Sequence, residues 1–154
     1  MIGDVDNPLV SIIIPLYNAS LYINDALESV LIQTYQRCEV VVFDDCSTDD
    51  SYSIVIDWIK VFSSKSIDLH LLKSSKSCPG GPGYARNEAI LSSHGHYICH
   101  LDADDFMDSR RVEYQLKAAL IKGKNCLLGC NFVRYPVYTY IYSIVSLPSH
   151  IIIL

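Results

Sequence analysis

The sequence predicts an α/β fold in which a mostly parallel β-sheet is flanked by helices. Short apolar, β-branched segments alternate with segments whose apolar residues recur at helical spacing. Strands that are apolar along their whole length are typical of parallel sheets, whose two faces are covered by helices. The chain has 154 residues, of which 50% are hydrophobic and 19% charged, so it is long enough for one globular domain.

The first strand–helix unit opens the predicted domain. Residues 9–15 are apolar and β-branched, and we expect Pro15 to stop this strand because proline has no N–H to donate to a neighbour. A stripe of apolar residues at helical spacing then begins at Ile23. Asn18 or Ser20 is expected to cap that helix.

The second unit repeats the pattern with acids at the end of the strand. Residues 39–43 form the strand, Asp44 and Asp45 follow it, and the apolar stripe of the next helix begins at Ile54. Residues 47–49 suit the N-cap of that helix. Asp44 and Asp45 lie earlier, at the strand tip, where both helix capping and ligand contact stay open.

The third unit contains a glycine- and proline-rich loop. A short strand over residues 68–72 is followed by this loop over residues 73–83 and by a helix over residues 84–92. Arg86, in the first turn of the helix, and the backbone N–H groups there are suited to hold an anionic group. The alternative is a surface loop with a solvated arginine.

The fourth strand, over residues 97–101, ends abruptly in three carboxylates, those of Asp102, Asp104 and Asp105. Crowded carboxylates repel one another unless a cation neutralises them, and hard oxygen ligands suit Mg²⁺ or Mn²⁺. Residues two apart in an extended chain face the same way, which would point Asp102 and Asp104 in one direction. The alternative is that these acids cap the next helix, predicted from Met107 to near residue 123.

The polar ends of three predicted strands belong at one edge of the sheet. Parallel strands share their carboxyl ends, and open parallel sheets bind ligands outside those ends. Tyr17 with Asn18, Asp44 with Asp45, and residues 102–105 would therefore gather in one place. A fifth short strand is predicted over residues 126–129.

Other features narrow the classes of function and site. The net charge of -5 argues against a large basic surface for nucleic acid. The six cysteines form no Cys-x-x-Cys pair, so we expect reduced thiols of a cytoplasmic protein and no zinc. His94 and His96 lack a third ligand that fits them, and His100 is expected to pack or hydrogen-bond within its strand. We find no secretory leader and expect no membrane-spanning segment.

Four motifs in order resemble those of family-2 glycosyltransferases with the GT-A fold. They are Val10–Asn18 (VSIIIPLYN), residues 42–49 (VFDDCSTD), residues 83–89 (GYARNEA) and residues 101–105 (LDADD). Within that family, the chain is similar to the β-1,3-N-acetylglucosaminyltransferase-like branch, whose human member is assigned as a queuosine-tRNA galactosyltransferase. The resemblance implies transfer of a hexose from a UDP-sugar to an acceptor hydroxyl, with a divalent metal, Mn²⁺ or Mg²⁺.

The resemblance also implies roles for individual residues. These residues fall into three groups: one lines the nucleotide pocket, one lies near the phosphates of the donor, and one holds the metal. These are Pro15, Tyr17 and Asn18 at the nucleotide, Asp45 at uracil with Asp44 close by, Arg86 near the phosphates, and Asp102 and Asp104 as the Asp-x-Asp element, with Asp104 the metal ligand and Asp105 in support.

The resemblance covers residues 9–130, which we expect to be the donor-binding part of the fold. Residues 1–8 would be an N-terminal tail, and residues 131–154 are an atypical apolar tail in which we find no family motif. We expect this tail to come from a truncated or misread gene. Inverting members of the family place a general base in the second half of the fold, so a non-catalytic nucleotide-sugar-binding remnant is the alternative function.

Overall fold

The computed structural model describes residues 7–122, 126–129 and 145–146. Its centre is a four-stranded sheet whose neighbours all run parallel, in the order β3-β2-β1-β4. The strands are β1 (Val10–Leu16), β2 (Cys38–Asp44), β3 (Asp68–Lys73) and β4 (Tyr97–His100). The helices between and after them are α1 (Ile23–Leu31), α2 (Ser51–Ser64), α3 (Pro82–Leu91) and α4 (Arg111–Lys122).

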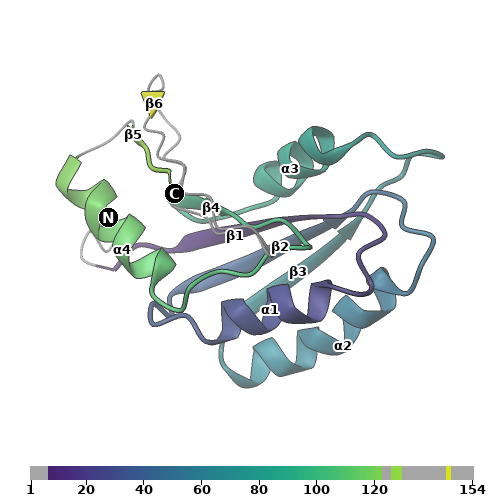
Figure 1. Ribbon diagram of the computed structural model, residues 1–154, viewed down its shortest axis with the longest axis horizontal. Helices are drawn as coiled ribbons and strands as arrows, with labels where there is room; N and C mark the ends of the chain where they lie inside the picture. Colours follow the sequence, from purple (N-terminus) through teal and green to yellow (C-terminus); the bar gives the residue numbers. More distant parts are fainter. Residues whose placement is uncertain (1–6, 123–125, 130–144, 147–154) are drawn as a thin grey trace, which may run out of the picture.

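Helices cover both faces of the sheet, which explains why its central strands β1 and β2 are mostly apolar (Figure 1). Alternate residues of a strand face opposite sides. Ile12 and Val40 belong to the larger core, which also contains buried residues of α1, α2 and α4. Ile13 and Val41 belong to a smaller core beneath α3. The predicted α/β layering and mostly parallel sheet are therefore confirmed.

Pro15 lies inside β1, so the expectation that it stops the strand is wrong. Its register partner is Phe43 of β2, and the strand continues to Leu16. The Ile13 carbonyl accepts a hydrogen bond from the Leu101 N–H on the β4 side. Pro15, two residues on, faces the same side beyond the end of the β4 pairing, so its missing N–H removes no bond of the sheet.

Several predicted helix boundaries and caps differ from the structure. The third helix begins at Pro82, because proline is well suited to the first turn of a helix, and the fourth begins at Arg111 instead of Met107. Tyr22 occupies the N-cap of α1 and Asp50 that of α2, neither with a side-chain cap bond. The residues expected to cap these helices instead join two loops, as described below.

The fifth predicted strand lies outside the parallel sheet. In the structure this strand is shorter than predicted. It is β5 (Cys126–Leu127), which pairs antiparallel with β6 (Val145–Ser146) in a separate two-stranded sheet. The remainder of the predicted apolar tail over residues 131–154 lies outside the described residues. Among the helices that the structure describes, none combines the length and apolar character needed to cross a membrane.

Candidate functional site

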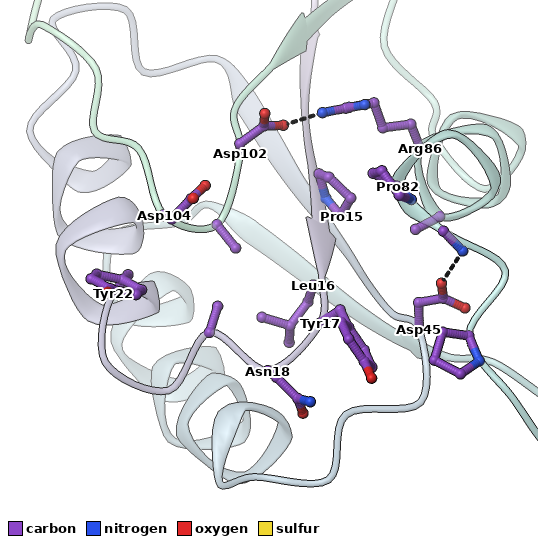
Figure 2. Close-up of a pocket in the computed structure, with 15 residues that line it drawn as sticks. Pro15, Leu16, Tyr17, Asn18, Tyr22, Asp45, Pro82, Arg86, Asp102 and Asp104 are labelled. Atoms are coloured by element: carbon purple, nitrogen blue, oxygen red, sulfur yellow. Dashed lines mark hydrogen bonds and ion pairs between the residues drawn. The ribbon is translucent and has the colours of Figure 1, made fainter. Parts of the chain in front are cut away.

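A pocket of about 520 Å³ opens at the carboxyl edge of the sheet (Figure 2). Its walls come from the loop after β1, the tip of β2, the first turns of α3 and the turn after β4. The lining includes six of the residues predicted for the donor site: Pro15, Tyr17, Asn18, Asp45, Arg86 and Asp102, and also the predicted metal ligand Asp104. The structure therefore brings together side chains that are up to 89 residues apart in the chain.

The loops after β1 and β2 are joined by hydrogen bonds between their residues. Asn18, at a φ of 47°, donates its N–H to Ser47 Oγ at 3.0 Å and accepts the Thr48 N–H at its Oδ1 at 2.7 Å. Farther along, Ala19 N–H donates to Ser51 Oγ at 2.8 Å. The polar residues that seemed suited to cap helices thus fix this wall of the pocket instead.

Asp45 anchors the glycine-rich loop to the tip of β2. Its two carboxylate oxygens accept the N–H groups of Gly80 and Gly81, at 3.0 and 2.7 Å, and the residue is only 2% exposed. Gly81 has a φ of 92°, a backbone conformation that side chains with a Cβ rarely adopt. The carboxylate therefore sets the position of the start of α3, the helix that carries Arg86.

Arg86 and Asp102 form an ion pair across the pocket. Nη2 of Arg86 donates to Oδ1 of Asp102 at 2.5 Å, and both side chains are partly exposed (Figure 2). Asp104 lies apart from this pair, on the other side of the turn, close to Tyr22 in the view of Figure 2. The guanidinium offsets the charge of Asp102, which leaves Asp104 as the exposed carboxylate at the pocket.

The acids after β4 lie in a turn, so the expectation of an extended Asp102–Asp104 segment is wrong. The Asp105 N–H donates to the Asp102 carbonyl at 3.0 Å, and the buried Ala103 packs into the core between the two pocket-lining acids. Asp105 is exposed outside the pocket lining. Partial burial and the charges of Asp104 and Asp102 raise the pKa of Asp105.

Asp44 lies behind the pocket wall. It is completely buried, and its Oδ1 accepts the Ser47 N–H at 3.3 Å. Its Oδ2 has no hydrogen-bond partner among the described residues. The structure thus separates the two neighbouring acids that the sequence could not distinguish: Asp45 lines the pocket and Asp44 supports the turn beneath it.

Sequence reasoning missed part of the pocket lining. The small side chains there are not distinctive in the sequence, but one aromatic side chain is. Tyr22 is half exposed at the start of α1, beside the loop after β1, and its place just before the apolar stripe could have indicated it. The other missed lining residues are Leu16, Ala19, Pro79, Gly81, Pro82, Ala85 and Ala103.

The family model described as glycosyl transferase family 2 matches residues 11–146. This chain belongs to glycosyltransferase family 2. The match includes the three strand ends and the start of α3 that surround the pocket. The resemblance of the four motifs to this family is therefore confirmed at the level of the family.

Among curated relatives of this family 2 chain is an Escherichia coli protein named UDP-Glc:alpha-D-GlcNAc-diphosphoundecaprenol beta-1,3-glucosyltransferase WfgD. It is 37% identical over 125 residues, which are 81% of this chain and 46% of the relative. The chain spans less than half the length of each of the first curated relatives that it matches.

Solved structures share the fold of this family 2 chain. S. aureus TarS, solved in complex with UDP-GlcNAc, gives a TM-score of 0.67 at 30% identity, covering 77% of this chain and 33% of TarS. The mannosyltransferase PcManGT from Pyrobaculum calidifontis gives a TM-score of 0.72 at 24% identity, covering 85% of this chain and 38% of that one. The four-stranded parallel sheet with its flanking helices is a GT-A fold.

Proposed function

We propose that this chain is the donor-binding part of a metal-dependent glycosyltransferase that transfers a hexose from a UDP-sugar to an acceptor hydroxyl. The observation that carries the proposal is the pocket at the carboxyl edge of the sheet, where Asp45 and Arg86 lie on the side of α3 and Asp104 lies across from them (Figure 2). Membership of glycosyltransferase family 2 supports it. The TarS complex with UDP-GlcNAc and the UDP-Glc named for the E. coli relative support the choice of UDP.

We assign the nucleoside to the side of the pocket formed by Pro15, Tyr17, Asn18 and Asp45. Tyr17 is half exposed and lies beside Asp45, where its ring can stack on a base (Figure 2). Each carboxylate oxygen of Asp45 accepts one glycine N–H, which leaves a lone pair on each. One of these is suited to accept the N–H of a uracil ring.

We assign the diphosphate and the metal to the opposite side. Arg86 supplies a fixed guanidinium for a phosphate oxygen. Asp104, with Asp102 beside it and Asp105 in support, supplies the hard oxygen donors that Mn²⁺ and Mg²⁺ prefer. These residues fit a divalent ion because three acids crowd one turn while Arg86 offsets only one of them. A bound ion there would neutralise the charge of the departing diphosphate.

The general base does not come from the lining of this pocket. Its three carboxylates, on the described residues, are those of Asp45, Asp102 and Asp104, and each already has a role in holding the loop, the arginine or the metal. This observation favours a second candidate function, a unit that binds the nucleotide sugar without transferring it. Catalysis by the full protein would then draw its base from residues outside the described ones.

The acceptor belongs to the proposal as well. The resemblance to the β-1,3-N-acetylglucosaminyltransferase-like branch supports queuosine of tRNA, although the chain itself carries a net charge of -5. A tRNA acceptor would therefore require a basic surface from elsewhere in the protein. The division into a donor-binding domain over residues 9–130 and a separate tail is part of the same proposal.

Binding of UDP with and without Mn²⁺ tests the donor site. We expect wild-type protein to bind UDP more tightly with Mn²⁺, and Asp104→Asn to lose this dependence on metal. Asp57→Asn, which removes an equal charge from the exposed side of α2, is the matched control and should keep it. Equal metal dependence in wild type and Asp104→Asn would contradict the metal assignment.

Hydrolysis of UDP-sugars separates the two candidate functions. A transferase that contains its own base is expected to release UDP from UDP-glucose or UDP-galactose slowly, with water as the acceptor. Tight binding without any release of UDP supports the binding unit. Release of UDP that survives in Asp104→Asn would contradict both, because neither then depends on the proposed site.

A further inference from the structure

A second cluster of polar side chains lies at the opposite edge of the sheet from the pocket. Glu39, the second residue of β2, is 3% exposed, and buried carboxylates require hydrogen-bond partners. Its Oε1 accepts three bonds: from Ser11 Oγ at 2.5 Å, from His94 N–H at 2.5 Å and from Gly95 N–H at 3.0 Å. One carboxylate oxygen is therefore fully used, and the carboxylate is fixed in orientation.

The backbone around this carboxylate is also fixed. A Cβ on Gly95 would lie 2.3 Å from Ser11 Oγ and 2.7 Å from Ser11 N, so only glycine fits there. This close approach holds the loop between α3 and β4 against the sheet. As a result, His94 is presented directly to Glu39.

The other carboxylate oxygen, Glu39 Oε2, faces two imidazoles. His94 Nδ1 lies 3.1 Å from it, and Nε2 of His70, which comes from β3, lies 3.6 Å from it. The three atoms all lie within 4.8 Å of one another, and the two rings have their centroids 5.8 Å apart. Three separate elements of the fold thus direct one oxygen and two nitrogens at the same point.

We propose that Glu39, His70 and His94 bind a Zn²⁺ ion. Zinc takes imidazole nitrogen and carboxylate oxygen in tetrahedral sites, where ligand atoms at the usual bond lengths of about 2.0–2.2 Å are about 3.4 Å apart. The two separations from Glu39 Oε2, 3.1 and 3.6 Å, lie on either side of that value, and the two nitrogens lie within 4.8 Å of each other. The bonds from Ser11 and Gly95 to the other oxygen supply the outer support that metal-binding carboxylates usually have.

Charge and access also suit a divalent transition metal. Although burial acts to raise it, hydrogen bonds from Ser11, His94 and Gly95 lower the pKa of Glu39, so the carboxylate supplies one negative charge beside the two imidazoles. The side chains of His70 and His94 are 42% and 69% exposed. Solvent therefore reaches the site, and a water molecule can complete the coordination.

This zinc site is independent of the donor pocket. Glu39 and Asp45 are six residues apart, on opposite ends of β2, which places the two sites about 20 Å from each other. Zinc would join β2, β3 and the loop before β4 at the amino edge of the sheet. The site could not be found from the sequence, because His96, which lies two residues after His94, is not one of its ligands.

Competition for Zn²⁺ against a chromophoric chelator tests the proposal on the full chain, in excess Mg²⁺ to occupy the acidic turn. Wild-type protein is expected to bind one equivalent of Zn²⁺. His70→Gln and His94→Gln should each weaken binding at least about tenfold. His96→Gln is the matched control, because it removes a neighbouring exposed histidine, and it should leave zinc affinity unchanged.

Two further measurements separate loss of the zinc site from loss of folding and from binding at the acidic turn. Far-ultraviolet circular dichroism establishes that each variant is folded, and Asp104→Asn should retain the zinc affinity of the wild type. In wild-type protein, Co²⁺ should give the intense visible absorption of a four-coordinate site. Absence of zinc binding by folded wild type would overturn the proposal, as would wild-type affinity in either His70→Gln or His94→Gln, or loss of binding in Asp104→Asn.

Discussion

The guanidinium of Arg86 in α3 donates a hydrogen bond of 2.5 Å to the carboxylate of Asp102, in the turn after β4. The pair joins two segments that meet only at the carboxyl edge of the sheet. It fixes Arg86 at the pocket and offsets the charge of Asp102. This arginine does not offset the charge of Asp104. The acidic turn therefore contains one carboxylate whose charge is offset, that of Asp102, and one that is exposed at the pocket, that of Asp104.

Replacing Arg86 tests this division. Arg86→Gln removes the guanidinium and leaves the charge of Asp102 facing the pocket, so UDP affinity should fall at least about tenfold, given about 1.5–3 kcal/mol for a charged hydrogen bond. Isothermal titration calorimetry with UDP and Mn²⁺ measures the change. Arg110→Gln is the control, since Arg110 lies over the ring of Tyr114 outside the pocket. Equal losses in the two variants would contradict the role of Arg86.

Two glycines of the loop before and within α3 give a matched pair. A Cβ meets no atom within 4 Å at either Gly81 or Gly83, but only Gly81 has a positive φ, of 92°. Gly81→Ala should therefore lower the free energy of unfolding by about 1–3 kcal/mol, through backbone strain alone. Gly83→Ala, within the helix, should raise it by about 0.5–1 kcal/mol. Urea unfolding measures both, and a loss in both variants would contradict the assignment to φ.

Gln33 joins α1 to the segment that follows the acidic turn. It is 2% exposed, its Nε2 donates to the carbonyls of Ser29 and Asp108, and its Oε1 accepts the Val112 N–H. Gln33→Ala removes these three bonds of a buried side chain and should cost about 2–4 kcal/mol of unfolding free energy in urea titrations, although the Asp108 carbonyl keeps its bond from the Arg111 N–H. The control is Gln36→Ala, which removes only the bond from an exposed side chain to the Gln33 carbonyl and should cost less than about 1 kcal/mol. Similar costs would argue against a buried role for Gln33.

Asp49 should give the stability a specific dependence on pH. Although burial acts to raise it, hydrogen bonds from Ser51 and Ser20 lower its pKa from 3.8 to about 2. An ionised carboxylate of this kind stabilises the fold above its unfolded pKa, and the contribution disappears as pH falls through the folded value. The stability difference between wild type and Asp49→Asn should thus be constant near neutral pH and shrink between about pH 4 and 2.

Acid titrations of unfolding free energy measure this difference. Asp57→Asn, on the exposed side of α2, is the control, and its difference from wild type should change less over the same range. A difference for Asp49→Asn that stays constant down to pH 2 would contradict the effect of the hydrogen bonds from Ser51 and Ser20.

The central strands could be predicted from the sequence because burial on both faces makes them mostly apolar, and the buried exceptions Ser11 and Glu39 bond to each other. The ends of the helices could not. Ser47 and Asp49 have side chains that suit an N-cap, yet both accept N–H groups of the loop after β1. Asp49 also accepts the Ser51 N–H at the start of α2, so tertiary contacts decide how these side chains are used. Pro15 was misjudged for a similar reason, since its effect depends on whether a neighbouring strand extends alongside it.

The site was predictable as far as parallel strands gather their carboxyl ends at one edge. That rule brings Asn18, Asp45 and Asp104 to one pocket. It does not distinguish Asp44 from Asp45, because adjacent residues of a strand face opposite sides and the sequence does not state which side is open. Nor could it find Glu39 with His70 and His94, whose contact depends on the pairing of β2 with β3.

The hydrogen bonds between the loops after β1 and β2 have a consequence for motion. Opening either loop breaks the bonds of Asn18, Ala19 and Ser20 to Ser47, Asp49 and Ser51 together. The amide protons of these loops should then exchange with solvent as one cooperative unit, at a common rate slower than that of an independent surface loop. These bonds would thus keep one wall of the pocket rigid.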